Sequence, residues 1–429
     1  MKNGILNRCA VLFLALTLFF SCLPTARAET TLLPPTALIL RQELMTGGML
    51  IKAPELTVNA LTAPEVDMLN ELMSAYTPPE TTLLVNASTY YYYYEQLDPV
   101  AKEIYDLLLQ LARDPVSEGN IQVMMTPLDP TTEDFEFAYL RAHYAVTLDH
   151  PELFWMYFFS GETEVSVEYR FRPVNGRYIV FFSMSEPFDA FEEQMAAFNN
   201  AATAFLANID RSASDYEIVK QIHDHLMDLT TYDIDVCNRN ASDLAHSAYG
   251  VLVENSAGIP NYAVCDGYSL AFEYLLQQCG IRATVVGGEG GKSPYEMGGH
   301  AWSLVNLDGE WYEVDSTWDD NAIDEGMLES LRGDPSYDLW LELIHDPVIR
   351  ERWGHRLFLI SSDKMEHYTA PTDVDWSFTF SNGYGPVDVP PDECYHVRMS
   401  EGMTTRYDSD YFQAMVIYLA PRAEHDYPQ

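Results

Sequence analysis

Positive charge is scarce in this chain of 429 residues, which contains 24 lysine and arginine residues against 65 aspartate and glutamate residues. The formal net charge is therefore −41 at pH 7. A surface of this sign repels phosphate backbones and anionic lipid headgroups, so nucleic acids and anionic membranes are poor candidates for partners. A solubilising acidic surface is the simplest interpretation of the imbalance.

Long apolar runs are equally scarce, and the one run of note lies at the N-terminus. Val11–Phe20 is too short to span a bilayer stably. It follows the basic residues Lys2 and Arg8 and precedes the small-residue cleavage pattern Ala26-Arg27-Ala28. This order is typical of an export signal, so we expect residues 1–28 to be removed and the protein to be secreted or held at the cell surface.

Lipid anchoring through Cys22 is the alternative use of this segment. The neighbouring Phe19 and Phe20 disfavour a lipoprotein cleavage site, so we rank secretion above anchoring. No later stretch is long and apolar enough for a transmembrane helix, and we expect no membrane span.

Cysteine is also rare, with six residues in the chain and four after the export signal: Cys237, Cys265, Cys279 and Cys394. Cys265 and Cys279 lie 14 residues apart on one predicted helix, which separates them by about 21 Å and excludes a disulfide between them. If Cys265 is reserved for chemistry, at most one disulfide can form among the other three. The chain is therefore not a disulfide scaffold.

Metal-ligand patterns are missing as well, since the chain has no C-x-x-C motif and no zinc spacing. His223 and His225 share a predicted helix, but at i and i+2 their side chains point about 200° apart. The acidic pairs Asp319-Asp320 and Asp233–Asp235 lack the ligand pattern of a calcium loop, although a calcium requirement stays open as an alternative. We expect no metal and no cofactor.

One cysteine stands at the start of a predicted helix. Apolar residues follow Cys265 at helical spacing: Phe272, Leu276 and Cys279. This pattern predicts an amphipathic helix over roughly Cys265–Gln278, with Gly280 as a stop signal. A thiol at a helix N-terminus feels the positive end of the helix dipole, which favours the nucleophilic thiolate. Cys265 is therefore a candidate nucleophile.

A histidine and an aspartate follow on a predicted hairpin, because Asp308-Gly309 is a two-residue turn signal between alternating runs. If these two residues form the loop, the numbers of cross-strand partners sum to 617 and Trp302 faces Asp315. His300 then shares the face of Trp302 and lies diagonally next to Asp315, about 7–8 Å away at the backbone and within side-chain reach. A slip of one residue would place the two side chains on opposite faces.

Cys265, His300 and Asp315 together supply the parts of acyl transfer through a thioester: a nucleophile, a base and a carboxylate that orients the base. Each residue alone has an ordinary structural explanation, as a buried thiol, a sheet histidine or a turn aspartate. The hairpin geometry makes the joint interpretation, a catalytic triad, the stronger one.

At these residues the chain resembles the transglutaminase-like superfamily, which is related to the papain-type cysteine peptidases. The matching motifs are V-C-D-G-Y around Cys265, G-H-A-W around His300 and W-Y-E-V-D-S-T-W-D-D around Asp315, and the resemblance extends from Asp215 to Tyr368. It implies an α+β fold, a transglutaminase-like (papain-like) core in which the helix that carries the cysteine packs on an antiparallel sheet. It also implies that the three residues form the catalytic triad.

The rest of the chain is divided around this core, because about 400 residues allow two domains with their own cores. Residues 29–208 combine a hairpin over Glu164–Met184 with a long helix near Pro187–Asn208. We expect them to form a smaller α+β module that supports the core or binds a partner. Residues 209–380 are then the catalytic domain, and 381–429 a C-terminal extension with additional strands.

The resemblance leaves the acyl acceptor open. Water makes the protein a peptidase or amidase, whereas a lysine amine makes it a cross-linking transglutaminase. We favour hydrolysis of protein or peptide amides, since nothing in the sequence requires an amine. A non-catalytic extracellular binding scaffold is the third hypothesis, and the intact set of three residues argues against it.

The remaining parts of the reaction can also be assigned. We expect the His300 ring to lie within about 4 Å of the Cys265 sulfur. The backbone N–H of Cys265 and one upstream aromatic side chain, Tyr249 or Tyr232, are expected to stabilise the oxyanion. Three tryptophans are available to line a water-excluding path, but packing explains them equally well: Trp302, Trp311 and Trp318.

Overall fold

The computed structural model describes the chain from residue 91 onward, with gaps. The described residues are 91–113, 121–156, 167–174, 176–184, 190–239, 243–321, 337–383, 385–398 and 420–428. The expected export signal and Cys22 lie outside them. The chain divides into two compact units, each described by itself: an N-terminal unit of residues 50–146 and 164–188, and a larger unit of residues 1–49, 147–163 and 189–429.

The N-terminal unit combines helices with a three-stranded antiparallel sheet of order β1-β3-β2. Its elements are α4 (Tyr92–Gln96), α5 (Pro99–Arg113), most of α6 (Glu133–Asp149), β1 (Ile121–Thr126), β2 (Val167–Val174) and β3 (Arg177–Met184). The carboxylate of Asp98 accepts hydrogen bonds from the first N–H groups of α5, and Pro99 begins the helix without an N–H to satisfy. This unit therefore contains both helices and strands, while the module expected over residues 29–208 stays a prediction.

The helix α7 (Phe191–Leu206) belongs to the larger unit, although the sequence placed it in the N-terminal module. Its Phe198 ring packs against Phe154 and Tyr274, with ring centroids 5.5 and 5.1 Å apart. These aromatic contacts hold α7 to the larger unit, so the boundary between the two units lies before residue 208. The boundaries at residues 208 and 380 remain predictions for independently folding domains.

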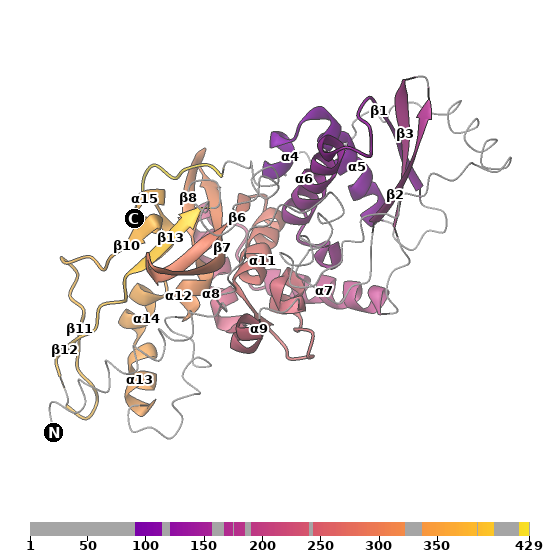
Figure 1. Ribbon diagram of the computed structural model, residues 1–429. Coiled ribbons are helices and arrows are strands. Elements are labelled where there is room, and N and C mark those ends of the chain that lie inside the picture. Colours follow the sequence, from indigo (N-terminus) through magenta and orange to yellow (C-terminus); the bar gives the residue numbers. More distant parts are fainter. Residues whose placement is uncertain are drawn as a thin grey trace. The chain divides into compact units, whose positions relative to one another are not determined.

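The larger unit is built on a six-stranded sheet of order β10-β13-β6-β7-β8-β9, in which every neighbouring pair is antiparallel. Figure 1 shows β6, β7 and β8 side by side, with β13 next to β6. The strands are β6 (Arg282–Ser293), β7 (Glu296–Leu307), β8 (Glu310–Val314), β9 (Phe358–Ile360), β10 (His367–Tyr368) and β13 (Cys394–Arg398). An α+β fold with an antiparallel sheet is therefore confirmed.

The hairpin of β7 and β8 has the predicted register. Leu307 faces Glu310 and Ser303 faces Val314, so the partner numbers sum to 617 as expected. Asp308 and Gly309 both have positive φ, of 54° and 91°, which is the conformation of a type I′ turn. This turn fixes which residues of the two strands share a face.

The predicted helix at the cysteine is α11, which spans Cys265–Gln278 and ends before Gly280 at a φ of +79°. Its bounds are confirmed, but the expected amphipathic character is wrong, because residues 266–276 are buried on every side. The strands β6 and β7 pack against α11, as do three helices: α8 (Asp215–Leu229), α10 (Ala248–Leu252) and α12 (Ser316–Asn321). A helix enclosed in this way can hold a reactive group rigidly.

The remaining elements surround this core. They are the short strands β4 (Thr231–Tyr232), β5 (Tyr262–Ala263), β11 (Ser377–Phe378) and β12 (Val387–Asp388), the helices α9 (Ile234–Arg239), α13 (Tyr337–Ile344), α14 (Pro347–Trp353) and α15 (Ser362–Glu366), and the 3-10 turns η1 (Phe154–Met156) and η2 (Leu244–His246). No helix among the described residues has both the length and the apolar character needed to cross a bilayer.

Candidate active site

The thiol of Cys265 is positioned by two short strands. β4 pairs in parallel with β5, which places Tyr232 opposite Ala263, and the chain enters α11 two residues later. The entry is tight, because a Cβ at Gly267 would lie 2.3 Å from the carbonyl oxygen of Ala245. Only glycine fits at this position, so the chain can turn tightly into the helix that Cys265 begins. The residue Cys265 itself is half-buried.

His300 and Asp315 meet as the hairpin register predicts. Nε2 of His300 lies 2.8 Å from Oδ2 of Asp315, and the side chains of the two residues are 6% and 0% exposed. Because an ionised carboxylate only accepts hydrogen bonds, this contact assigns the proton on the ring to Nε2. Nδ1 of His300 is then the nitrogen left to take a proton from a nucleophile.

The carboxylate of Asp315 is fixed at both oxygens. Oδ1 accepts the backbone N–H of Trp318 at 3.1 Å, and the backbone N–H of Asp315 donates to the carbonyl oxygen of Leu357 at 3.0 Å. Burial alone would raise the pKa of Asp315, but His300 and His396 outweigh burial and hold that pKa well below its ordinary value. Asp315 is therefore ionised at neutral pH, as an orienting carboxylate must be.

The thiol lies beside the strand that carries His300. The backbone N–H of Ala301, the next residue in β7, donates a hydrogen bond to the Cys265 sulfur. This contact favours the thiolate, but removal from water and the nearby Asp266 carboxylate raise the pKa of Cys265 well above its ordinary value. Desolvation and a negative neighbour therefore oppose the helix dipole at this thiol.

A second histidine–carboxylate pair lies next to the thiol, and no sequence motif had indicated a role for it. Nδ1 of His246 lies 2.9 Å from both carboxylate oxygens of Asp266. One of these oxygens also accepts the backbone N–H of Gly267, at 3.1 Å. The pair spreads the charge of Asp266 over several donors, which moderates its effect on Cys265.

Of the two tyrosines considered for the oxyanion, Tyr232 is the one near the thiol. Burial raises the pKa of Tyr232 well above its ordinary value, and the neighbouring thiols of Cys265 and Cys237 add to that shift. Tyr249 instead packs against Phe154, with ring centroids 4.6 Å apart, and is 2% exposed. The Tyr232 side chain also forms a hydrogen bond with Cys237, and its part in binding an oxyanion stays a prediction.

The tryptophans near the site are packing residues. The ring of Trp302 stacks on His300 at 6.0 Å and its Nε1 donates to Glu313 at 2.6 Å, while Trp318 packs on His300 at 5.5 Å. The residues Trp302 and Trp318 are only 1% and 4% exposed, and Trp311 packs against the same hydrophobic cluster. These side chains cover the histidine from behind and do not line an open path for an amine.

Glycines in β6 make room for these rings, a role that was not predicted from the sequence. A Cβ at Gly290 would lie 3.0 Å from the His300 ring, and one at Gly288 would lie 2.7 Å from the Trp302 ring. The run G-G-E-G-G at residues 287–291 could have indicated this, because glycine inside a strand marks a close approach by another group.

His396 on β13 is a further residue of the site that was not predicted from the sequence. Its Nε2 is 2.9 Å from Oδ2 of Asp315, the same oxygen that His300 contacts. Its Nδ1 is 3.0 Å from the carbonyl oxygen of Met365. No sequence signal links residues 81 positions apart, so only the pairing of β13 with β6 reveals this contact.

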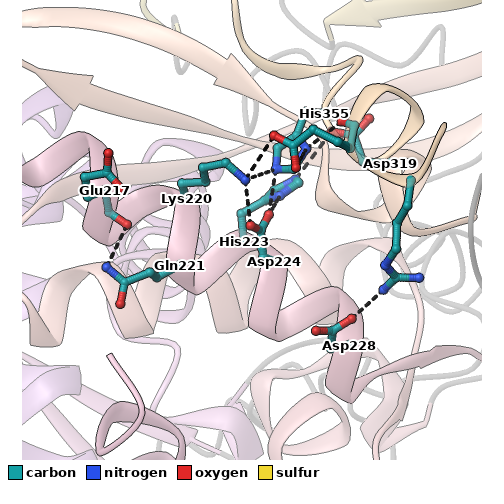
Figure 2. Close-up of polar contacts among 10 residues, drawn as sticks. Glu217, Lys220, Gln221, His223, Asp224, Asp228, Asp319 and His355 are labelled. Atoms are coloured by element: carbon teal, nitrogen blue, oxygen red, sulfur yellow. Dashed lines mark hydrogen bonds and ion pairs between the residues drawn. The ribbon is translucent and has the colours of Figure 1, made fainter. Parts of the chain in front are cut away.

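A separate cluster on α8 has the spacing of a metal site, because the ligand atoms of His223, Asp224 and His355 lie within 4.8 Å of one another. Figure 2 shows Lys220 among them, and its Nζ lies 2.8 Å from Asp224 and 3.0 Å from Nε2 of His355. Because this ammonium supplies the positive charge at the centre of the cluster, we interpret it as an ion-pair network. The ring of His225, two residues after His223, packs on Phe205.

The acidic pairs considered for calcium have protein partners. Asp233 accepts the backbone N–H of Val236 and the amide of Asn255, at 2.9 and 2.6 Å. Asp320 accepts the hydroxyl of Tyr268 at 2.5 Å, and Asp319 is completely buried. Oδ1 of Asp319 accepts the backbone N–H of Leu357 at 3.0 Å, and its Oδ2 lies 3.4 Å from Nε2 of His223.

The other thiols differ from Cys265 in their surroundings. Cys265, Cys279 and Cys394 are free. Burial raises the pKa of Cys279, and it raises the pKa of Cys394 to about 12. Neither thiol has a histidine in the role that His300 can serve for Cys265, so both are interpreted as structural.

Comparisons with known proteins agree with this geometry. The family described as "Transglutaminase-like superfamily" matches residues 203–316, which include Cys265, His300 and Asp315. The kyphoscoliosis peptidases of Mus musculus and Homo sapiens are each 36% identical to this chain over 67 residues. Each match covers 14% of this chain and 10% of the relative, so the chain spans about a tenth of the length of these relatives.

A solved structure described as "Crystal structure of a TGase" aligns with 50% of this chain and 57% of its own length. The sequence identity is 16% and the TM-score is 0.24, and a likeness at this level carries no argument about function.

Proposed function

Because residues 203–316 form a transglutaminase-like domain, we propose that this protein is an exported cysteine enzyme that cleaves amides of proteins or peptides through a thioester. Cys265 is the nucleophile, His300 the general base and acid, and Asp315 the orienting carboxylate. The observation that carries the proposal is the buried contact between His300 and Asp315. It lies beside the thiol, because the backbone N–H of Ala301, the residue after His300, donates to the Cys265 sulfur.

The first half of the reaction forms the thioester. Nδ1 of His300 takes the proton of Cys265, and the resulting thiolate attacks the amide carbonyl carbon. The negative charge that develops on the carbonyl oxygen is stabilised by the backbone N–H of Cys265 and the hydroxyl of Tyr232. His300 then returns the proton to the departing amine as the carbon–nitrogen bond breaks. This pairing with His300 offsets the raised pKa of the isolated thiol.

The second half of the reaction releases the acyl group. His300 takes a proton from water, the hydroxide attacks the thioester carbon, and the carbon–sulfur bond breaks. Cys265 recovers its proton and a carboxylic acid leaves. Asp315 stabilises the imidazolium of His300 in both halves, which is why its low pKa matters for the mechanism.

Water is favoured over an amine as the acceptor for two reasons. Trp302 and Trp318, which could line a water-excluding path, are buried against His300 rather than open to an acceptor. The curated relatives carry the name peptidase, although the match covers a tenth of their length. Cross-linking by transfer to lysine amines is the second candidate, supported by the acidic surface, which attracts lysine-rich proteins. A non-catalytic scaffold is the third, and the contacts of His300 and Asp315 argue against it.

The experiment that tests the proposal is incubation of the protein with a glutamine-containing peptide pool, with and without a labelled primary amine, followed by mass spectrometry. We expect peptide cleavage, which is abolished in Cys265→Ser while the melting temperature of that variant stays within a few degrees of the wild type. Amine incorporation without cleavage would establish transfer instead. A Cys265→Ser variant with full activity would end the assignment of the nucleophile.

A further inference from the structure

We propose that His396 is a positioning residue of this active site, which makes the C-terminal strand β13 part of the catalytic apparatus. The inference rests on the proposed function for its kinetic consequences and on contacts within the fold for its geometry. His396 lies outside the residues that match the superfamily, 203–316, so it is a feature of this chain's own C-terminal region.

Two histidines share one carboxylate oxygen at this site. Nε2 of His300 and Nε2 of His396 lie 2.8 and 2.9 Å from Oδ2 of Asp315. The side chains of His396 and Asp315 are both completely buried. The backbone N–H of Trp318 holds Oδ1 of Asp315, and His396 adds to His300 a second donor at Oδ2, which restrains the oxygen that orients the base. We therefore treat the three residues as one unit, the two-histidine clamp.

The surrounding elements hold His396 firmly. β13 pairs with β6 so that His396 faces Gly290, the glycine that lies against the His300 ring. The His396 ring packs on Trp302 and Trp318 at centroid distances of 5.1 and 4.9 Å. A ring confined on all sides in this way has one orientation, which is the property a positioning residue needs.

The partners of the two ring nitrogens determine how many protons His396 carries in the clamp. The carbonyl oxygen of Met365 can only accept, so Nδ1 of His396 donates to it at 3.0 Å. The ionised carboxylate of Asp315 also only accepts, so Nε2 donates as well. Both nitrogens donate at once only in the protonated ring. The complete clamp therefore requires the imidazolium form of His396.

The surroundings decide at which pH that form exists. The titratable groups that face the ring are His300 on β7 and Asp315 after β8, while α12 presents the Trp318 ring and α15 a backbone carbonyl. Along β13 itself, Cys394 is buried and Arg398 is paired with Glu313. Burial lowers the pKa of His396 below its ordinary value and Asp315 opposes this in part.

The lowered pKa of His396 determines how its contribution to positioning changes with pH. Below it, His396 is protonated and the clamp is complete. As the pH rises through that pKa, His396 loses one proton and one of its two contacts becomes repulsive. The contribution of His396 to positioning is therefore present below this pKa, which lies under the ordinary histidine value of about 6.5, and is lost as the pH rises through it.

The test compares His396→Gln, which keeps an amide donor but does not titrate, with His396→Phe, which has no donor. His367→Gln is the matched control, since His367 lies on the adjacent strand β10 with a side chain 48% exposed. The probe is alkylation of Cys265 by iodoacetamide between pH 5 and 8, and the measured quantity is the part of the rate constant that is lost in His300→Ala.

We expect His396→Phe to lower this His300-dependent rate by about ten- to a hundred-fold, because displacing a catalytic group by about 1 Å costs on the order of a hundredfold. His396→Gln should stay within a few-fold of the wild type at the acidic end of the pH series and lose the decline toward higher pH. His367→Gln should match the wild type. A folded His396→Phe protein with the wild-type rate and profile would overturn the proposal, as would a His396→Gln profile that keeps the decline.

Nitrogen-15 NMR of the histidine rings separates this inference from the proposed function. In the wild type, at pH values below the pKa of His396, both ring nitrogens of His396 should be protonated, and the Nε2 proton of His300 should exchange slowly. That proton should exchange faster in His396→Phe. If alkylation proves independent of His300, the proposed function fails, and the NMR result still decides the clamp. An unchanged His300 signal in His396→Phe would contradict the clamp whatever the activity.

Discussion

At the scale of single residues, the site depends on which groups neighbour the thiol and the imidazole. Cys265 is an unfavourable thiolate on its own, since burial and Asp266 raise its pKa. In the proposed mechanism His300 takes the proton of this thiol, and Asp315, 2.8 Å from Nε2 of His300, orients the ring for that step. The reactivity therefore belongs to the group of residues and not to the helix N-terminus alone.

The role of Tyr232 is tested by Tyr232→Phe. Removal of the hydroxyl should lower kcat for peptide hydrolysis by about ten- to a thousand-fold with little change in KM, because an oxyanion donor acts mainly in the transition state. Tyr249→Phe is the control and should leave both constants unchanged, since Tyr249 packs against Phe154. Equal loss in the two variants would show that the hydroxyl of Tyr232 has no special role.

The role of Gly290, which lies against the His300 ring, is tested by Gly290→Ala. The added Cβ would lie 3.0 Å from the His300 ring, so the ring has to shift by a few tenths of an ångström. We expect iodoacetamide to label Cys265 several-fold more slowly, up to about tenfold. Gly299→Ala is the matched control, because a Cβ there meets nothing within 4 Å. A Gly290→Ala protein that labels at the wild-type rate would show that His300 has more room than the structure indicates.

At the scale of elements, the parts of the site that lie close in sequence could be predicted. The turn at Asp308-Gly309 fixes the register of β7 and β8, and this register brings His300 to Asp315 without any other information. The bounds of α11 could be predicted as well, because Cys265 and Gly280 mark its two ends. Its burial on all sides could not, since it depends on elements distant in sequence.

The ion-pair network on α8 is the second element-scale feature, and it links this helix to His355 after α14. Burial would raise the pKa of Asp224, but His223 and His355 hold it well below the ordinary value. Burial would lower the pKa of His223, but Asp224 and Asp319 outweigh it and raise that pKa. Asp224 therefore stabilises the fold above about pH 3.9, and His223 does so below about pH 6.5.

The consequence is tested with Asp224→Asn. We expect the free energy of unfolding to fall by about 1–2 kcal/mol near pH 5, since bonds to charged partners are lost and water screens part of the charge of a side chain that is 39% exposed. The difference from the wild type should shrink as the pH falls through the Asp224 pKa and as it rises through the raised pKa of His223. Urea denaturation at a series of pH values measures this.

The control for this prediction is Asp228→Asn on the same helix, where the side chain is 61% exposed and paired with Arg350. An exposed pair contributes little, so the control should change stability by less than about 1 kcal/mol at any pH. An Asp224→Asn effect that is equally small, or that does not vary with pH, would contradict the network.

At the scale of the whole molecule, the sequence could not predict the contacts between distant segments. His396 reaches Asp315 only because β13 pairs with β6, and His355 reaches Asp224 across 131 positions. Neither pairing leaves a local pattern of turn or periodicity. The acidic composition, by contrast, is visible at once, and it concerns partners rather than the fold.

The central claim is that His300 activates Cys265, and one measurement tests it most directly. Iodoacetamide labelling at neutral pH, followed by peptide mapping, compares Cys265 with Cys279, a half-buried thiol of the same chain whose pKa burial also raises. We predict that Cys265 reacts at least about tenfold faster than Cys279 and that His300→Ala abolishes this advantage while Cys279 is unaffected. Equal labelling of the two thiols in the wild type, or a fast Cys265 in His300→Ala, would contradict the account.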